Sequence, residues 1–236
     1  MGNVMANSIS RRLEEVRARM GKAARRAGRD PGRIRLIAVS KTKPVPMIRE
    51  AVAAGVTDLG ENYIQEAREK IPQVAGDVHW HFIGHLQTNK AKYAARLFDW
   101  VHTIDRKEIA DALNRRAAME GRVLKVLIEV NVGKEATKSG VMEEELMPLV
   151  EHVAPLPSLS LRGLMVIPPL ALDPEEARGY FVKTRRLAEQ VAARGIPGVA
   201  MSELSMGMTA DFEVAIEEGS TMIRVGTAIF GPREMP

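Results

Sequence analysis

The sequence predicts an α/β protein that consists of one (β/α)8 barrel with an extra helix at its N-terminus. From about residue 34, an apolar run, a polar junction and an amphipathic stretch repeat about eight times. Such alternation indicates parallel strands joined by helices, and eight units in 236 residues fit a closed barrel. An open doubly wound sheet remains the alternative, because periodicity does not show closure.

The chain shows no linker that would divide it. No proline-rich, glycine-rich or low-complexity segment interrupts the repeats. We therefore predict one domain, in which residues 1–33 form a helical segment that packs on a barrel of residues 34–236.

Composition excludes several classes of protein. Hydrophobic residues make up 45% and charged residues 27% of the chain, as in ordinary globular proteins. The absence of cysteine excludes disulfides and thiolate chemistry. No apolar run approaches the roughly 20 residues of a membrane span, and the N-terminus lacks the apolar core of a secretory signal. We expect a cytoplasmic protein that does not contact membranes.

The first predicted element is a basic helix from about residue 9 to 27. Leu13, Val16, Met20 and Ala24 form its apolar stripe, and residues 28–32 end it. Residues 1–35 hold ten Lys or Arg against three Asp or Glu, whereas the chain as a whole has a net charge of +4. A basic helix of this kind could bind nucleic acid. Without a nucleic-acid-binding motif, we favour a solvated helix face and expect no nucleic-acid partner.

The first half of the barrel begins with the apolar run at 34–39, which is typical of a strand buried on both faces. Pro44 and Pro46 prevent its continuation. Further strands are predicted at 57–63, 79–84 and 100–105. The intervening helices are predicted at about 47–55, from the end of the second strand to about 70, and at 91–97. Asp105 and Glu108 have the spacing of a capping box for the next helix.

The second half continues the pattern. Residues 124–132 form the clearest strand, and a helix follows at about 143–153. A strand at 159–168 precedes a helix whose start is marked by Asp173, Pro174 and Glu176 and which runs to Gly195. A weak strand at about 200–204 and a short helix from 209 to 219 come next. The eighth apolar run, 221–231, leads to the end of the chain.

Lys41 stands where the first strand ends. A lysine held against apolar surroundings loses part of its preference for the charged form and becomes an amine nucleophile. The alternative is a lysine that extends into solvent from a strand end. In a (β/α)8 barrel, the carboxyl ends of the strands form the active site. Other polar or flexible positions at these ends are Asn62, His85, Asn131 and 165–168.

Two segments near the last strands have the components of an anion site. Residues 205–209 (SMGMT) offer hydroxyls, a glycine and the amides of a helix start, and Arg224 to Thr227 add a second glycine and hydroxyl. Each element alone is more simply a helix cap or a packing glycine. Combined with a nucleophilic amine, they suit a phosphorylated aldehyde held as an imine, such as pyridoxal phosphate (PLP) or a sugar-phosphate aldolase intermediate.

His79, His81 and His85 raise the question of a metal site. Residues two apart on a strand share a face. However, no carboxylate lies within the run to complete the ligand set, so we predict no metal.

Eight motifs, which span Leu36 to Gly231 in order, resemble those of the pyridoxal phosphate homeostasis protein family. They are AVSKTKP, GENYIQE, WHFIGHLQTNK, HTID, KSG, LRGLMVIP, LSMGM and STMIRVGTAIFG. The resemblance implies a barrel like the N-terminal domain of alanine racemase, with PLP bound as a Schiff base to Lys41.

The same resemblance implies roles for further residues. Ser205, Gly207, Gly226 and Thr227 would hold the phosphate, while Met206 and Met208 would line the pocket. Arg224 would face the pyridine nitrogen, and Asn62 and His81 would lie near the ring. Lys138 corresponds to a family lysine that is discussed as a secondary cofactor site.

The resemblance implies a non-catalytic carrier or regulator of intracellular PLP. An arginine at the pyridine nitrogen disfavours its protonation and weakens the ring as an electron sink. Racemisation also needs a second acid or base, which related racemases take from a C-terminal β domain that we do not expect after Pro236. Tyr93 and Tyr180 fall in predicted helices. The alternative function is that of a racemase-like PLP enzyme or a Schiff-base aldolase. The expected partners are PLP and PLP-dependent apo-enzymes. The expected oligomeric state is a monomer.

Overall fold

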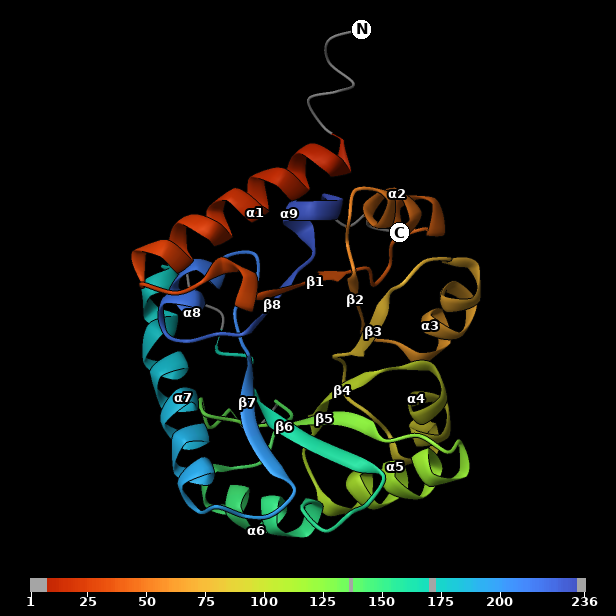
Figure 1. The fold of residues 1–236 in the computed structure, drawn as a ribbon, viewed down its shortest axis with the longest axis vertical. Helices are drawn as coiled ribbons and strands as arrows, with labels where there is room; N and C mark the ends of the chain where they lie inside the picture. Colours follow the sequence, from red (N-terminus) through yellow and green to blue (C-terminus); the bar gives the residue numbers. More distant parts are fainter. Residues whose placement is uncertain (1–7, 136–137, 170–172, 233–236) are drawn as a thin grey trace, which may run out of the picture.

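The computed structural model describes residues 8–135, 138–169 and 173–232, and its strands close a parallel barrel in sequence order (Figure 1). The predicted closed barrel is confirmed, and the open sheet is excluded. The strands are β1 (Arg35–Val39), β2 (Asp58–Glu61), β3 (His79–Phe82), β4 (Trp100–Ile104), β5 (Leu124–Glu129), β6 (Leu159–Met165), β7 (Val199–Ser205) and β8 (Met222–Val225). Hydrogen bonds between β1 and β8 complete the ring.

Helices surround this barrel (Figure 1). The α-helices are α1 (Ile9–Arg26), α2 (Val45–Ala53), α3 (Ile64–Lys70), α4 (Ala91–Leu97), α5 (Lys107–Met119), α6 (Glu143–Val153), α7 (Arg178–Ala193), α8 (Phe212–Glu217) and α9 (Thr227–Phe230). Short 3-10 helices lie at 31–33, 71–73, 88–90 and 174–177. No helix in the described part of the chain has the length and apolar character needed to cross a bilayer.

Two predicted details were wrong, and the helix predicted from 209 to 219 is shorter than expected, because α8 covers only Phe212–Glu217. The apolar run at 221–231 is not one strand, because β8 ends at Val225 and α9 begins at Thr227, after Gly226. Asp105 and Glu108 do not form a capping box: Arg106 occupies the N-cap of α5 without a side-chain cap, and Asp105 instead pairs with Arg106. Asp173, by contrast, accepts a hydrogen bond from the Glu175 amide, as its predicted capping role requires.

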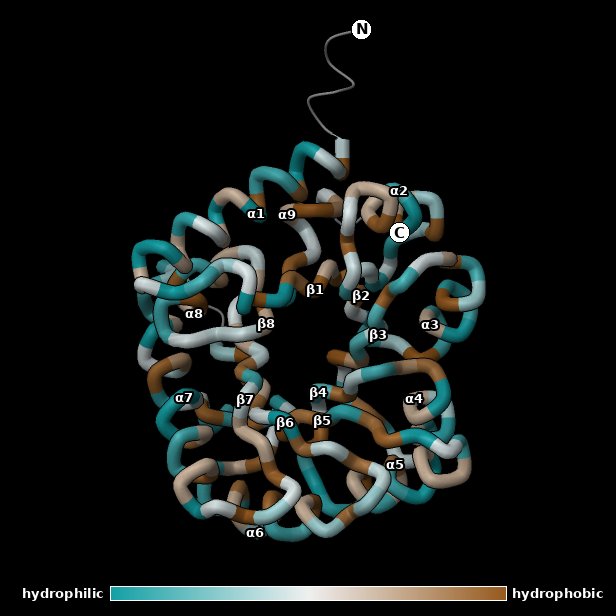
Figure 2. The backbone as a smooth tube through the Cα atoms, viewed as in Figure 1, coloured by the Kyte–Doolittle hydropathy of each residue, from teal (hydrophilic) through white to brown (hydrophobic). Residues whose placement is uncertain are grey.

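The core has two layers. Inside the barrel, the apolar side chains pack in one cluster: Ile37, Trp100, Leu127, Met165 and Met222. A larger cluster fills the space between the strands and the helices. Figure 2 shows hydrophobic segments along the strands and hydrophilic ones on the outer turns. This arrangement explains why the strands appear as apolar runs in the sequence.

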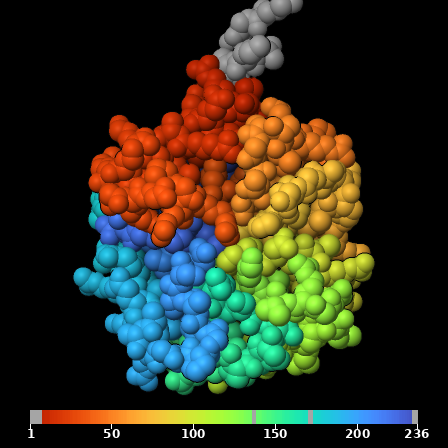
Figure 3. Space-filling model, in the orientation of Figure 1, coloured from red at the N-terminus to blue at the C-terminus, as the bar shows by residue number. Residues whose placement is uncertain are grey.

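The N-terminal helix α1 packs against the barrel beside α8 and α9 (Figures 1 and 3). Ile9, Leu13 and Val16 are buried in the common core. Residues 1–7 of the predicted N-terminal segment and residues 233–236, including Pro236, lie outside the described residues.

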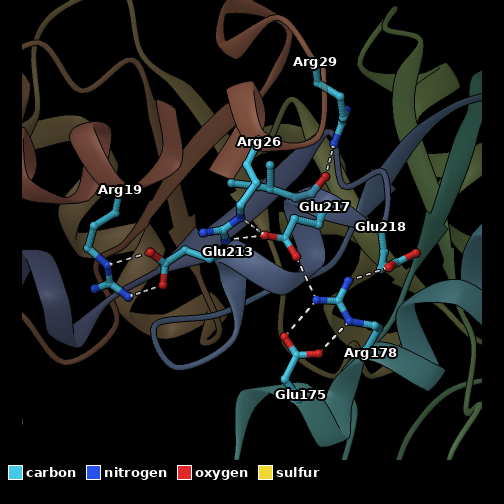
Figure 4. A network of polar contacts seen from close by, with 9 residues as sticks. Arg19, Arg26, Arg29, Glu175, Arg178, Glu213, Glu217 and Glu218 are labelled. Carbon is cyan, nitrogen blue, oxygen red and sulfur yellow. Dashed lines mark hydrogen bonds and ion pairs between the residues drawn. The ribbon is translucent and has the colours of Figure 1, made fainter. Parts of the chain in front are cut away.

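Arginines of α1 and the following turn contact acidic α8 (Figure 4). Arg19 Nη2 lies 2.8 Å from Glu213 Oε2, and Arg26 pairs with Glu217. On the other side of Glu217, Arg178 binds Glu175, Glu217 and Glu218. Part of the basic charge predicted for a solvated face therefore pairs within the molecule.

Candidate functional site at the carboxyl end of the barrel

A cavity of about 270 Å³ lies at the carboxyl ends of the strands. Its lining consists of Val39, Lys41, Asn62, Ile83, Ile167, Met208, Thr209, Ala210, Arg224, Gly226 and Thr227. Six of the predicted site residues therefore meet here, although they come from β8 and from the segments after β1, β2, β7 and β8. The volume is close to the lower end of the range for small-molecule sites, roughly 300 Å³.

Lys41 lies in a tight turn directly after β1. Thr42 adopts a φ of +62°, which non-glycine residues seldom do, and its amide donates to Glu66 Oε2 at 2.7 Å. Beneath the turn, buried Lys70 donates to the Ser40 carbonyl at 2.9 Å and to Glu61 Oε1 at 3.0 Å. The turn that carries Lys41 is therefore fixed to β2 and α3 by charged hydrogen bonds.

Arg224 lines the cavity from β8, the strand that pairs with β1, and is 4% exposed. Its Nη1 donates to the carbonyl and the hydroxyl oxygen of Ser205 at 2.6 and 2.7 Å, and its Nη2 donates to the Val166 carbonyl at 2.8 Å. Burial lowers the pKa of Arg224 to about 10, partly offset by Asp211 and Glu129. The guanidinium therefore remains charged at neutral pH and is fixed in one orientation.

Four predicted site residues do not line the cavity. Ser205 is fully buried behind Arg224, and Met206 lies in the core between strands and helices. Gly207 is also buried, with a φ of +94°, and contacts α8. His81 lies inside the barrel, stacked on Trp100 with ring centroids 5.8 Å apart. These four residues are therefore buried outside the cavity lining.

The structure adds residues that the sequence did not assign to the site. Thr209 and Ala210 line the cavity, because α8 begins only at Phe212. The loop before it is held by the Met208 amide, which donates to Asp211 Oδ1 at 2.6 Å. Thr209 was predicted to belong to an anion-binding segment or to cap a helix; its position in a loop that ends only at Phe212 could not be derived from the sequence.

The wall around Gly226 and Thr227 is suited to an anion. The amides of Ile229 and Phe230 both donate to the Gly226 carbonyl. Those of Thr227 and Ala228 have no intrahelical acceptor, because they belong to the first turn of α9. The buried Asn62 Oδ1, which belongs to the same lining, has no hydrogen-bond partner among the described residues. The lining thus combines hydroxyls and a guanidinium with an acceptor oxygen.

A second cavity of about 250 Å³ adjoins the first and shares Asn62, Ile83 and Ile167 with it. Glu129 lines it, and burial together with nearby Asp105 raises the pKa of Glu129 to about 7. Lys138 also lines this second cavity, where its Nζ donates to the Pro168 carbonyl at 3.1 Å. Lys138 therefore lies beside the Lys41 cavity and does not line it.

The three histidines considered for a metal site are dispersed. His79 is exposed, His81 is buried inside the barrel, and His85 lies 3.0 Å from Ser139 Oγ at the surface. Among the described residues, no group of three or more His, Cys, Asp or Glu side chains is arranged to hold a metal ion.

Another cavity, of about 510 Å³, lies at the opposite end of the barrel. Arg17, Arg33 and Arg35 line it together with Asp58 and Glu203. In this fold the amino ends of the strands contribute to stability, and the carboxyl ends carry the chemistry. We therefore place the functional site at the smaller cavity, which contains Lys41.

Comparison with known proteins identifies the family of this chain. The family described as "Alanine racemase, N-terminal domain" matches residues 12–234. The pyridoxal phosphate homeostasis protein of Escherichia coli K12 is 47% identical over 233 residues, which cover 97% of this chain and 98% of that protein.

Solved structures show the same relationship. PipY of Synechococcus elongatus, solved with PLP bound, is 37% identical, has a TM-score of 0.84, and is matched over 94% of this chain and 100% of its own. An alanine racemase of Corynebacterium glutamicum shares the fold at 18% identity and a TM-score of 0.69, over 93% of this chain and 61% of its own. The predicted resemblance is thus confirmed: the chain belongs to the alanine racemase N-terminal domain family, and within it to the pyridoxal phosphate homeostasis proteins.

Proposed function

We propose that this protein binds PLP in the Lys41 cavity and acts in PLP homeostasis, with Lys41 bonded to the cofactor as a Schiff base. The observation that carries the proposal is geometric. An amine at the end of β1 and an arginine, a glycine and a threonine at the end of β8 line one small cavity. The names of its relatives, and the PLP bound in PipY, support the same assignment.

The residues fit the chemical groups of PLP. The first-turn amides of α9, with the hydroxyls of Thr227 and Thr209, suit a phosphate. Arg224 suits the pyridine nitrogen, and the unpartnered Asn62 Oδ1 suits a hydrogen-bond donor near the ring. When bound, PLP supplies an aldehyde that reacts with amines and a ring that withdraws electrons.

The charge of Arg224 favours storage over turnover. Because this buried guanidinium keeps its proton at neutral pH, it would donate to the ring nitrogen of bound PLP and would disfavour protonation there. A ring with an unprotonated nitrogen withdraws electrons less strongly, so carbanion chemistry gains less from it. These properties suit a protein that holds the cofactor and releases it.

The test is to reduce the PLP-loaded protein with borohydride and locate the modified lysine by mass spectrometry. We expect a visible absorbance band that borohydride removes, and a pyridoxyl group on Lys41. Lys41→Ala should lose both while remaining folded. Lys43→Ala is the matched control, because Lys43 lies in the same loop but its Nζ donates to the Pro232 carbonyl. Modification elsewhere, or no PLP uptake, would contradict the assignment.

A second candidate, a PLP-dependent racemase-like enzyme, is favoured by Glu129 alone. A carboxyl group with a pKa of about 7 in the adjoining cavity can exchange protons near neutral pH. The PLP-loaded protein would then exchange the α-hydrogen of an amino acid for deuterium, as NMR in D2O detects, and Glu129→Gln would abolish the exchange. We expect no exchange above that caused by free PLP.

We also propose that the protein is a monomer that passes PLP to apo-enzymes. Its exposed large hydrophobic residues are dispersed in the described chain, with Tyr63 and Ile167 near the cavities and Met119 and Val123 around the end of α5. Sedimentation velocity should give a mass near 26.0 kDa. A dimer would contradict the proposed monomer. Mixing the PLP-loaded protein with a PLP-dependent apo-enzyme should restore that enzyme's activity, and a failure to restore it would contradict the proposed transfer of PLP.

A further inference from the structure

A line of hydrogen-bonded polar side chains crosses the barrel interior and ends on Arg224. It begins at Asp58 on β2, whose Oδ1 lies 2.9 Å from His81 Nε2. His81 Nδ1 lies 3.0 Å from His102 Nε2, and His102 Nδ1 lies 2.9 Å from Ser205 Oγ. Ser205 Oγ in turn accepts from Arg224 Nη1. We call Asp58, His81, His102 and Ser205 the barrel relay.

The relay is isolated from water. His81, His102 and Ser205 are fully buried, and Asp58 is 6% exposed at the edge of the large cavity at the opposite end. Buried polar groups of this kind are costly unless every donor has an acceptor. The relay therefore requires a single consistent arrangement of protons.

The two ends dictate that arrangement. Arg224 can only donate and the Asp58 carboxylate can only accept, so with both histidines neutral Ser205 Oγ accepts from Arg224 and its own hydrogen goes to His102 Nδ1. His102 must then carry its proton on Nε2 and donate to His81 Nδ1. His81 in turn carries its proton on Nε2 and donates to the Asp58 carboxylate. All donors therefore point from Arg224 to Asp58, and both histidines are neutral.

The surroundings of the two histidines include groups that raise their pKa values and groups that lower them. Desolvation lowers the pKa of both, most strongly for His102. Asp58 and Asp99 raise the pKa of His81, whereas Arg35 lowers it. His81, Arg224 and Arg35 all lower the pKa of His102. Burial, the largest of these effects, thus favours the neutral histidines on which this arrangement of protons depends.

We propose that the barrel relay is a positioning device for Arg224, which fixes the guanidinium so that its remaining N–H groups face the cofactor ring in one orientation. This inference rests on the proposed function. Ser205 occupies both N–H groups of Nη1, and the Val166 carbonyl occupies one of Nη2. Within the described part of the chain, these contacts leave one Nη2–H and the Nε–H for a ligand. His102 and His81 act through Ser205 and do not touch the ligand.

The first test needs no cofactor. Nitrogen-15 NMR of the unloaded protein reports the tautomer of each histidine. We expect His81 and His102 to remain neutral, with the proton on Nε2, across about pH 5 to 8, where an ordinary histidine changes charge. A histidinium at either position within that range, or a proton on His102 Nδ1, would overturn the relay whether or not PLP binds.

The second test measures the bound cofactor. His102→Leu removes both hydrogen bonds of the imidazole ring. It should weaken PLP binding about tenfold, which is the usual effect of disturbing a hydrogen bond to a charged group. It should also shift the pH midpoint of the cofactor absorbance. The matched control is His152→Leu, which removes a histidine that pairs with Asp111 at 2.8 Å on the outside of the barrel. This control should keep the wild-type midpoint.

Variants of Asp58 keep the proposal testable if His102→Leu fails to fold. Asp58→Asn retains an acceptor oxygen for His81 and should preserve the wild-type absorbance profile. Asp58→Ala removes that acceptor and should shift the profile in the same direction as His102→Leu. An unchanged profile in Asp58→Ala, with wild-type affinity, would overturn the positioning role. Wild-type protein that binds no PLP would instead refute the proposed function, while the NMR result would still decide the relay.

Discussion

At the residue scale, Gly207, which was predicted to contact the phosphate, has a packing role in the structure. Its φ of +94° lies where side chains are strained, and an added Cβ would lie 2.6 Å from Ala215 Cβ and 2.9 Å from Phe212 Cα. Glycine therefore allows the loop after β7 to pack closely on α8. The same packing fixes the position of Met208, which does line the cavity.

Gly207→Ala should lower the free energy of unfolding by about 3 kcal/mol, because overpacking and positive-φ strain add. The matched control is Gly179→Ala in α7, where a Cβ would meet nothing within 4 Å. That change should be neutral or stabilise by up to about 1 kcal/mol, since alanine favours helix. Urea denaturation of both variants measures the difference, and equal stability would contradict the packing role.

Glu129 introduces a pH dependence. Its pKa is raised from 4.5 to about 7, so the folded protein binds more protons than the unfolded chain between these values. The stabilising contribution is fully present below about pH 4.5 and is lost as pH rises through about 7. The full loss is about 3 kcal/mol, by the relation of about 1.4 kcal/mol per pKa unit.

Glu129→Gln should remove this dependence. At pH 8 the variant should be more stable than the wild type by up to about 3 kcal/mol, and near pH 4 the two should be similar, because glutamine resembles the protonated acid. Urea titrations at several pH values give the two curves. Parallel curves across this range would show that the carboxyl group of Glu129 does not titrate as expected.

At the element scale, the loop after β1 is held by a buried ionic cluster. Lys70 is 8% exposed and contacts Ser40, Glu61 and Glu66. Burial raises the pKa of Glu61, and Lys70 partly opposes this rise. Since Ser40 precedes Lys41, this cluster connects α3 to the position of the amine.

Lys70→Met should cost about 3 kcal/mol of stability at pH 7, because it leaves Glu61 buried without its cation. The double variant Lys70→Met/Glu61→Leu removes both charges and should recover most of that loss. Chemical denaturation at one pH compares the three proteins. If the double variant were as unstable as the sum of both single changes, the two residues would not be coupled.

Some elements could be predicted from sequence and others could not, for physical reasons. The bounds of α6, 143–153, agree with the amphipathic pattern, and the interior strands stand out because both of their faces are buried. The break at Gly226 was missed, because the residues of α9 are as apolar as those of β8. Periodicity detects burial and cannot tell a buried short helix from a continuing strand.

In the candidate site, too, some features could be predicted from the sequence and others could not. Lys41, Asn62 and Arg224 follow or end strands, so the barrel geometry alone predicts that they converge. The barrel relay could not be predicted, because it depends on register: His81 pairs in the sheet with Gly60 and Trp100, and this places its ring between Asp58 and His102. Sequence spacing identifies the end of a strand but not its register with its neighbours.

At the scale of the whole molecule, α1 shares its core with the barrel. Leu13 is 1% exposed, and α1 packs against α2, α8 and α9. If residues 1–33 and the barrel form one domain, a defect in α1 should destabilise strands far from it. The two tryptophans, Trp80 and Trp100, report on this, because both are buried in β3 and β4.

Leu13→Ala should therefore lower the stability of the entire protein by about 3 kcal/mol, the usual cost of a cavity in a core. In urea, tryptophan fluorescence and far-UV circular dichroism should shift to the same lower midpoint. Arg11→Ala on the exposed face of α1, which removes only a pair with Glu15, should change stability by less than about 0.5 kcal/mol. A fluorescence midpoint unchanged in Leu13→Ala, with an early loss of helix alone, would mean that α1 folds separately and that the barrel stands without it.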